Sequence, residues 1–186
     1  MDSYYYLVAS LPTLLLEEEP PITTAEFLES CGRWLNPGEV RDMRGILEDA
    51  FSANENVSGE APCVSRWREH ETQIRNAVAK LRAPKTRTDA EPFMRPCRGI
   101  SLFIDKAVAE AMSRPNPLER ELALDQLRWK LAEDLALFEP FGLAAVAAYA
   151  VKLKLVERWS VLDKEKALAV VEDFLSKQLA EAEALP

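Results

Sequence analysis

The sequence is poor in the residues from which most catalytic and cofactor sites are built. Its 186 residues include one histidine, three cysteines and six glycines. The histidine, His70, is followed by Glu71, but position 74 is Ile, so the zinc motif with two histidines on one helix face is missing. Neither a glycine-rich phosphate loop nor a C-x-x-C pair occurs. These absences predict a chain without a metal ion, a nucleotide or another cofactor, and without catalysis.

Long hydrophobic runs are also missing. The uncharged run at residues 140–151 is too short to cross a bilayer, which takes roughly 20 apolar residues. The N-terminus lacks the basic residues and the cleavage pattern of a signal peptide. An odd number of widely spaced cysteines is typical of reduced thiols in a cytosolic protein: Cys31, Cys63 and Cys97. We therefore expect a soluble cytoplasmic protein that does not insert into the membrane.

The charge balance argues against nucleic acid as a partner. The net charge is -8, whereas nucleic-acid binding is dominated by basic residues that neutralise phosphates. One local exception lies between residues 80 and 98, where basic residues outnumber acidic ones and include Lys85, Arg87, Arg95 and Arg98. This segment is either a surface for an acidic partner or a solvated linker.

Apolar residues recur at helical spacing through most of the chain. Thr23 with Glu26, and Asn116 with Pro117, have the spacing of helix N-termini. The expected helices cover residues 23–34, 39–51, 63–82, 99–112, 116–138, 140–159 and 163–184. Residues 3–16 are too few for periodicity to separate a short strand from a first helix turn. The pattern predicts an all-α bundle of about six to seven helices, in one or two lobes, with a short irregular or strand-like N-terminal segment.

The helix expected around residues 141–159 is the one on which the others should pack. It is apolar on all sides at its start and amphipathic at its end, which is typical of a central core helix. The helix at 163–184 would be its antiparallel neighbour. Prolines interrupt the stretch before these helices. The predicted organisation is an N-terminal helical lobe at 1–82, a basic proline-containing linker at 83–98 and a C-terminal bundle at 99–186.

Two stretches resemble a known family. They are SYYYLVASLP at residues 3–12 and AYAVKLKLVERW at residues 148–159. Both resemble an uncharacterised bacterial family encoded among the subunits of V/A-type ATP synthases, and both are similar to a shortened form of the C-type (or d) subunit of those rotary enzymes. That all-helical subunit begins with a tyrosine-rich segment and carries a helix with a tyrosine, a lysine, a glutamate and an arginine. By position these correspond to Tyr149, Lys152, Glu157 and Arg158 here.

The resemblance implies a non-catalytic subunit or assembly factor that links the central shaft to the membrane rotor ring by protein contact. Its partners would be V/A-type ATP synthase subunits, and it would be peripheral to the inner membrane through that complex. Candidate partner-binding residues, from the resemblance and from the basic segment, are Tyr4, Tyr5, Tyr6, Lys85, Arg87, Arg95, Arg98, Tyr149, Lys152, Glu157, Arg158 and Trp159. The alternative for each is ordinary: tyrosines in the core, a solvated linker, or charge on a helix surface.

Two other hypotheses remain open at the level of sequence. The first is an unrelated soluble helical adaptor that joins acidic or basic partners. The second is an enzyme that uses a carboxylate or a lysine in a pocket between two lobes. A complex with rotary subunits would separate the adaptor from the rotary role, and a deep cleft with two convergent titratable groups would favour the enzyme.

Overall fold

The computed structural model describes residues 2–16, 18–49 and 59–162. All regular structure in these ranges is helical and none of it is strand, which confirms the predicted all-α class. Within these described ranges, residues 143–162 are helical in addition to six α-helices and one 3-10 helix, η1. Their bounds are α1 Asp2–Ser10, α2 Thr24–Trp34, α3 Pro37–Leu47, α4 Pro62–Thr86, η1 Glu91–Phe93, α5 Leu102–Ser113 and α6 Pro117–Ala136.

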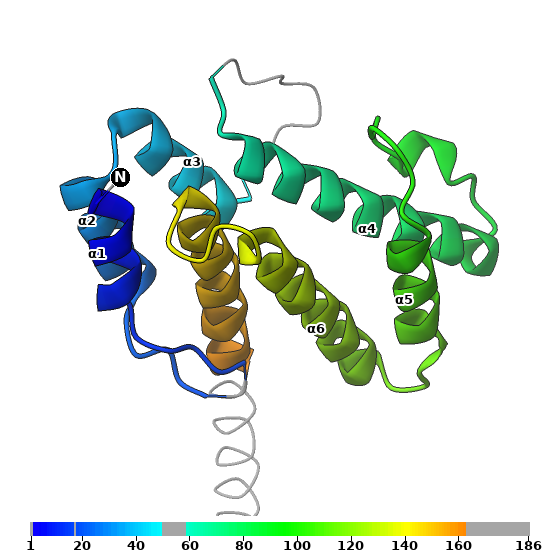
Figure 1. The fold of residues 1–186 in the computed structure, drawn as a ribbon. Helices are drawn as coiled ribbons and strands as arrows, with labels where there is room; N and C mark the ends of the chain where they lie inside the picture. The colour runs from blue at the N-terminus through cyan, green and yellow to red at the C-terminus, as the bar shows by residue number, and fades with distance from the viewer. Residues whose placement is uncertain (1, 17, 50–58, 163–186) are drawn as a thin grey trace, which may run out of the picture.

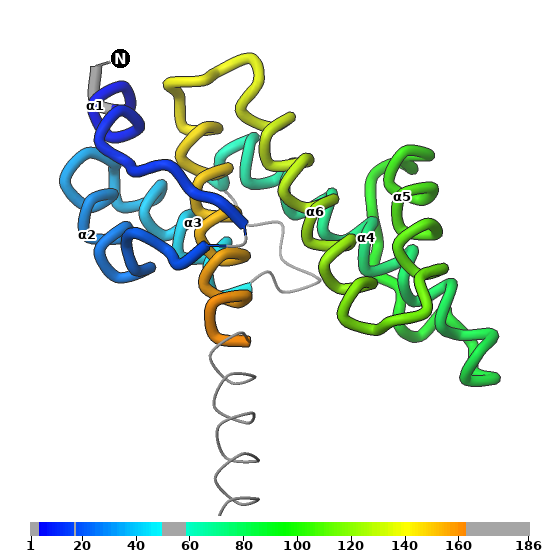
Figure 2. Tube along the Cα trace, turned by 90° about the horizontal axis from the view of Figure 1, so that it is seen from below, coloured from blue at the N-terminus to red at the C-terminus, as the bar shows by residue number. Residues whose placement is uncertain are grey.

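The helical residues 143–162 lie in the middle of the molecule, as the sequence predicts for its central helix. In Figures 1 and 2, α1, α2 and α3 lie on one side of them, and α4, α5 and α6 lie on the other. Val146, Leu153 and Val156 in this helix are fully buried, and they belong to one core cluster that includes residues from every α-helix. Both groups of helices therefore share a core through this central element.

Side-chain caps explain where two of the helices begin. The Thr23 hydroxyl accepts from the Glu26 N–H at 3.2 Å, and the Glu26 carboxylate accepts from the Thr23 N–H at 2.8 Å, which confirms the predicted capping box. Asn36 and Glu39 form a second box, with both bonds at 3.0 Å. Because Pro37 is suited to a first helical position, α3 begins there and not at residue 39, where the sequence pattern predicted its start.

The strand-like or irregular N-terminal segment is a wrong prediction. Residues 2–10 form the helix α1, and Pro12 lies beyond its end, so the proline does not interrupt it. Leu7 is fully buried, while Tyr5 and Tyr6 are exposed. A helix satisfies most of its own backbone groups, whereas a single strand here would need a second strand, and the described part of the chain has none.

Helix α4 extends four residues beyond its predicted end at Arg82. Pro84 lies inside its last turn, where the missing N–H removes only one helical hydrogen bond. The helix ends at Thr86, and the residue that follows it, Arg87, has a left-handed backbone with φ 53°. The predicted linker at 83–98 is therefore helical at its start. The division into lobes stays a prediction, and α4, expected in the N-terminal lobe, packs on α5 and α6.

The central helix also continues further than predicted. A turn was expected after Trp159, but residues 160–162 are helical. Ser160, Val161 and Leu162 include neither glycine nor proline, so the local sequence contains nothing that ends a helix. The helix predicted at 163–184 lies outside the described residues.

Candidate functional site

Asp125 is the centre of a charge network inside the helical bundle. It is fully buried on α6, and its carboxylate accepts from Arg128 at 2.8 Å and from the Trp159 indole N–H at 2.9 Å. A guanidinium nitrogen of Arg158 lies 3.2 Å from the same carboxylate. A buried carboxylate is costly unless it is paired and hydrogen-bonded. These contacts satisfy Asp125 and join α6 to the central helix.

Glu71 connects this network to α4. It is buried, and it accepts from Arg128 Nε at 2.9 Å, from Arg128 Nη2 at 3.1 Å and from Arg75 Nε at 2.9 Å. Burial by itself would raise the pKa of Glu71, but the charges and hydrogen bonds of the two arginines outweigh burial and hold the pKa below its ordinary value. Glu71 is therefore a carboxylate at neutral pH, and Arg128 bridges α4 and α6.

A pocket of about 330 Å³ opens beside this network. The described basic side chains in its wall are all ion-paired: Arg75, Arg128, Lys154 and Arg158. A general acid at neutral pH needs a raised pKa, whereas the pKa of Glu71, the buried carboxylate in the wall, is lowered. The arrangement therefore favours a role in holding helices together over proton donation by Glu71 or the binding of an anion.

Three residues predicted to bind partners pack against neighbouring helices, and of these Trp159 is buried while Tyr149 and Glu157 are half-buried. The Trp159 indole is buried against Asp125. The Tyr149 ring stacks on Phe27 with centroids 5.4 Å apart, and burial raises the pKa of its hydroxyl to about 12. Glu157 accepts from the Thr24 N–H at 2.7 Å and from the Thr24 hydroxyl at 2.6 Å. Each of these side chains attaches the central helix to a neighbouring helix.

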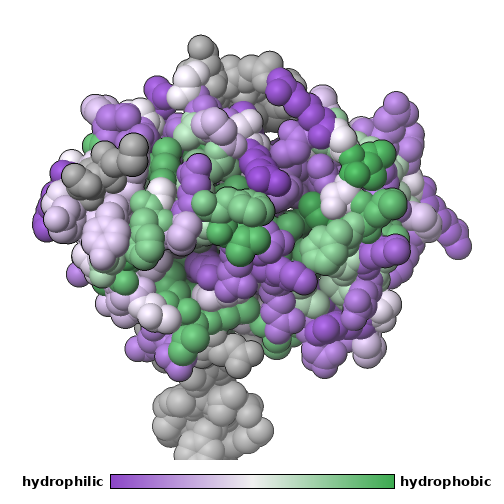
Figure 3. Space-filling view, viewed as in Figure 1, coloured by the Kyte–Doolittle hydropathy of each residue, from purple (hydrophilic) through white to green (hydrophobic). Residues whose placement is uncertain are grey.

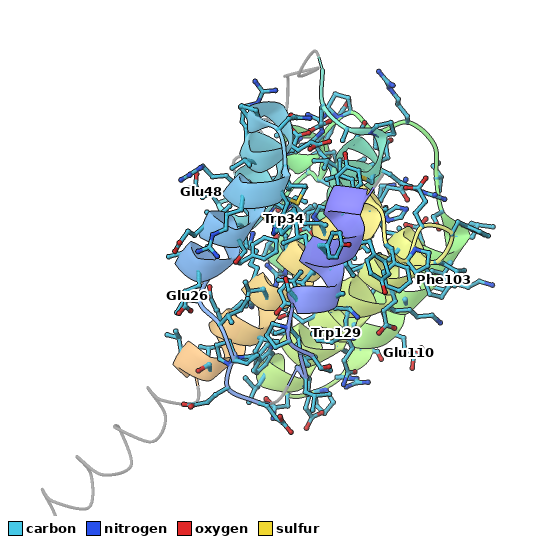
Figure 4. All side chains as sticks on the ribbon, turned by 60° about the vertical axis from the view of Figure 1, so that its left-hand side comes forward. Glu26, Trp34, Glu48, Phe103, Glu110 and Trp129 are labelled. Atoms are coloured by element: carbon cyan, nitrogen blue, oxygen red, sulfur yellow. The ribbon has the colours of Figure 1, made fainter. Side chains whose placement is uncertain are left out.

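Two further predicted residues of the central helix reach the surface but have partners within the chain. Lys152 lies 3.0 Å from Glu133 and places its ammonium 4.6 Å from the centre of the Trp129 ring. Arg158 contacts Glu121 at 2.9 Å in addition to Asp125. Figure 4 labels Trp129, the α6 side chain that Lys152 covers. These contacts join the central helix to α6.

The three tyrosines at residues 4–6 differ in how far their side chains are exposed. Tyr4 is half-buried and donates to a Glu39 oxygen at 2.5 Å, and this hydrogen bond, with burial, raises the pKa of Tyr4 to about 12. Tyr5 and Tyr6 are 51% and 56% exposed. Tyr4 is therefore part of the packing between α1 and α3, and only Tyr5 and Tyr6 are available to a partner.

Tyr5 and Tyr6 belong to an exposed aromatic surface, which we define as Tyr5, Tyr6, Trp34 and Phe141. Tyr6 stacks on Trp34 with ring centroids 5.7 Å apart, and Tyr5 contacts Phe141 at 5.0 Å. Figure 4 labels Trp34 beside α1. In Figure 3 hydrophobic residues cover the adjoining turn before the central helix, which includes the 85% exposed Phe138. Three segments far apart in the sequence thus form one aromatic surface.

The four basic candidates lie at the end of α4 and along the segment that follows it. Lys85 and Arg87 are exposed, and no ion pair involves either of them within the described ranges. The backbone at Arg95 is held to α4, because its N–H donates to the Asn76 side chain at 2.9 Å and its carbonyl accepts from Asn76 at 2.8 Å. The Arg98 N–H donates to Glu69. The basic segment is therefore anchored to α4 at residues 95 and 98.

Sequence reasoning missed the charge network and half of the aromatic surface. A signal for the network was present, because Asp125 lies among Leu124, Leu127 and Leu131 on the side of α6 that becomes buried. A carboxylate in such a stripe indicates a buried partner. Trp34 and Phe141 carried no comparable signal, since only the packing of α1 brings them beside the tyrosines.

Among known proteins, a family model described as a protein of unknown function, DUF2764, matches residues 99–179. The match is less than half of the chain. It covers α5, α6 and the described part of the central helix. No curated protein and no solved structure matches the chain.

Neither a membrane-spanning helix nor a metal cluster is present in the part of the chain that the structure describes. No helix there is long and apolar enough to cross a bilayer. No group of three or more histidine, cysteine, aspartate or glutamate side chains in the same ranges could hold a metal ion.

Proposed function

We propose that the protein is a non-catalytic subunit or assembly factor of a V/A-type rotary ATPase, similar to the C-type (or d) subunit, which binds shaft and rotor subunits by protein contact. The observation that carries the proposal is the aromatic surface. It presents two of the tyrosines of the resembling N-terminal stretch, and exposed tyrosine, tryptophan and phenylalanine are enriched at protein interfaces.

The rest of the molecule agrees with a connecting role. The charge network ties α4, α6 and the central helix together, which gives the rigidity that a part between a shaft and a rotor ring needs. The second resembling stretch, at residues 148–159, supplies Arg158 and Trp159 to that network. In this proposal the second stretch holds the body together and the first makes the contact, in the cytoplasm at the inner membrane.

The test is an affinity purification of the tagged full chain from mildly solubilised native membranes, with bound proteins counted by mass spectrometry. Recovery of shaft and rotor-ring subunits at near-equal amounts supports a resident subunit, and recovery of partly built complexes supports an assembly factor. Recovery of no rotary subunit at low or moderate salt overturns the proposal and leaves an unrelated helical adaptor.

A pair of variants tests whether the aromatic surface makes the contact. Tyr5→Ala with Tyr6→Ala should lower recovery of rotary subunits about tenfold, since interface aromatics are among the residues whose truncation weakens binding most. Phe103→Ala is the matched control, because Phe103 is also exposed but lies on α5, where Lys130 covers its ring. Equal recovery with both variants would exclude the aromatic surface as the contact.

A further inference from the structure

A second concave surface lies between the C-terminal half of α4 and the N-terminal half of α6. It is a pocket of about 460 Å³, which falls in the range of natural binding pockets. Both helices and η1 contribute to its mostly apolar lining, which includes Ile74, Val78, Ala79, Ala83, Leu124 and Phe93. An apolar pocket of this size can hold a large apolar side chain.

Phe93 lines this pocket and is nevertheless 67% exposed. Its backbone is fixed: its N–H donates to the Ala90 carbonyl at 3.0 Å, and the Asp89 carboxylate accepts from the Glu91 N–H at 3.1 Å. The two hydrogen bonds between Asn76 and Arg95 hold the chain just after it. A large apolar side chain held in place beside an apolar pocket is typical of an interaction site.

Basic residues neighbour the pocket lining along the sequence, in a chain whose net charge is -8. Lys85 and Arg87 follow Ala83 of its lining along the chain and have no ion pair within the described ranges. Arg82 is in the lining itself, 3.7 Å from Glu121. Residues 80–98 contain two acidic residues, Asp89 and Glu91, against six basic ones, so this segment has a net positive charge. We call Lys85 and Arg87 the basic rim of the pocket. A ligand that contacts the basic rim should carry negative charge.

We propose that the pocket and its basic rim bind an acidic amphipathic helix of a partner protein. One large apolar side chain of that helix enters the pocket against Phe93, and its carboxylates face Lys85 and Arg87. A groove between two helices that combines an apolar floor with charge is the usual receptor for such a helix. This inference goes beyond the rotary proposal and does not depend on it. It rests on the pocket between α4 and α6 and the basic residues beside it, whereas the rotary proposal rests on the aromatic surface and on a resemblance in sequence.

The probe is a short synthetic helix-forming peptide with glutamates on one face, leucines on the other and one central phenylalanine. Its binding to the full chain is followed by fluorescence anisotropy at low and moderate salt. Saturable binding that weakens with salt is expected. Phe93→Ala should raise the Kd about tenfold, and Lys85→Glu or Arg87→Glu should each raise it about threefold at low salt.

Matched controls distinguish binding at this site from nonspecific binding of the peptide. Phe138→Ala removes another highly exposed phenylalanine, and Lys106→Glu reverses another exposed basic residue, on α5. Neither should change the Kd. Two control peptides, with lysine in place of glutamate or alanine in place of the central phenylalanine, should bind at least tenfold more weakly. Circular dichroism confirms that each variant is folded.

Several outcomes would overturn the inference. They are the absence of saturable binding at low salt, equal binding of the lysine peptide, and the same Kd for Phe93→Ala and Phe138→Ala. Binding to vesicles of phosphatidylcholine and phosphatidylserine without binding to the acidic peptide would also overturn it, and would assign the surface to anionic lipid. Backbone amide shifts confined to Val78, Leu124 and Phe93 on adding peptide would place the helix in the pocket.

Discussion

Two groups of arginines and lysines in this protein are both cationic, but one group is ion-paired within the helical bundle and the other is exposed. Arg128 and Arg158 reach into the bundle and meet Asp125, whereas Lys85 and Arg87 stand at the surface without an ion pair in the described ranges. What differs between the two groups is whether a carboxylate of the same chain lies within reach of the cation. A buried carboxylate makes a cation part of the packing, and an exposed cation without one stays available to another molecule.

The comparison predicts the largest loss of stability at Asp125. Asp125→Ala removes the buried carboxylate that Arg128, Arg158 and the Trp159 N–H share, and should lower the free energy of unfolding by about 3–5 kcal/mol. Urea unfolding followed by circular dichroism measures this. Asp134→Ala, on the exposed side of the same helix, is the control and should change it by about 0.5 kcal/mol or less. Similar losses in both variants would contradict the role given to the network.

Glu71→Gln tests the charge network through the pH dependence of the free energy of unfolding. The pKa of Glu71 is lowered in the folded protein, so its contribution is fully present above the ordinary value of 4.5. That contribution is lost as the pH falls from there through the lowered folded pKa. At neutral pH the variant should lose about 2 kcal/mol, because hydrogen bonds to a charged group are removed. The wild-type free energy of unfolding should also decline more steeply below pH 4.5; parallel pH profiles would contradict this account.

Trp159→Phe removes one donor to Asp125 and keeps an aromatic ring. The expected loss in the free energy of unfolding is about 1–2 kcal/mol, since one buried hydrogen bond is lost while both arginines remain. Trp34→Phe is the counterpart on the aromatic surface, where the ring is 43% exposed, and should change stability by about 0.5 kcal/mol or less. A larger loss for Trp34→Phe would show that the aromatic surface is part of the fold.

The smallest effect on stability is expected where the charges are exposed. Lys85→Glu with Arg87→Glu should change the free energy of unfolding by about 0.5 kcal/mol or less, because neither side chain has an ion pair to lose within the described ranges. Chemical denaturation of the double variant measures it. The same variant should weaken binding of the acidic peptide. A stable variant with unchanged peptide binding would make these residues solvated surface only.

Several features could be predicted from the sequence because their causes are local. Thr23 and Glu26 satisfy each other's backbone donors across three residues, so the pattern was enough to place the start of α2. The apolar stripes predicted which elements are helices, and the run without charge at residues 140–151 predicted the central one. Of the candidate site, Lys85 and Arg87 were named from composition alone, and their exposure agrees with that prediction, while their binding of a partner stays a prediction.

The features that were missed depend on contacts between distant segments. Whether residues 2–10 form a strand or a helix depends on the place that Leu7 finds in the core, and the local sequence fits both. Tyr149, Glu157 and Trp159 follow one another along an amphipathic helix, but only its neighbours Phe27, Thr24 and Asp125 decide that these side chains are occupied within the chain.

The sequence by itself determined that this protein is helical, which helix is central and where positive charge gathers in an acidic chain. Helix formation, capping and composition act over a few residues, so a linear pattern carries them. Only the tertiary structure decided which charges are paired, which tyrosines face outward and that Phe93 stands beside an apolar pocket. Those properties belong to side chains brought together from remote positions, and the free energy of a charge or a ring depends on what surrounds it after folding.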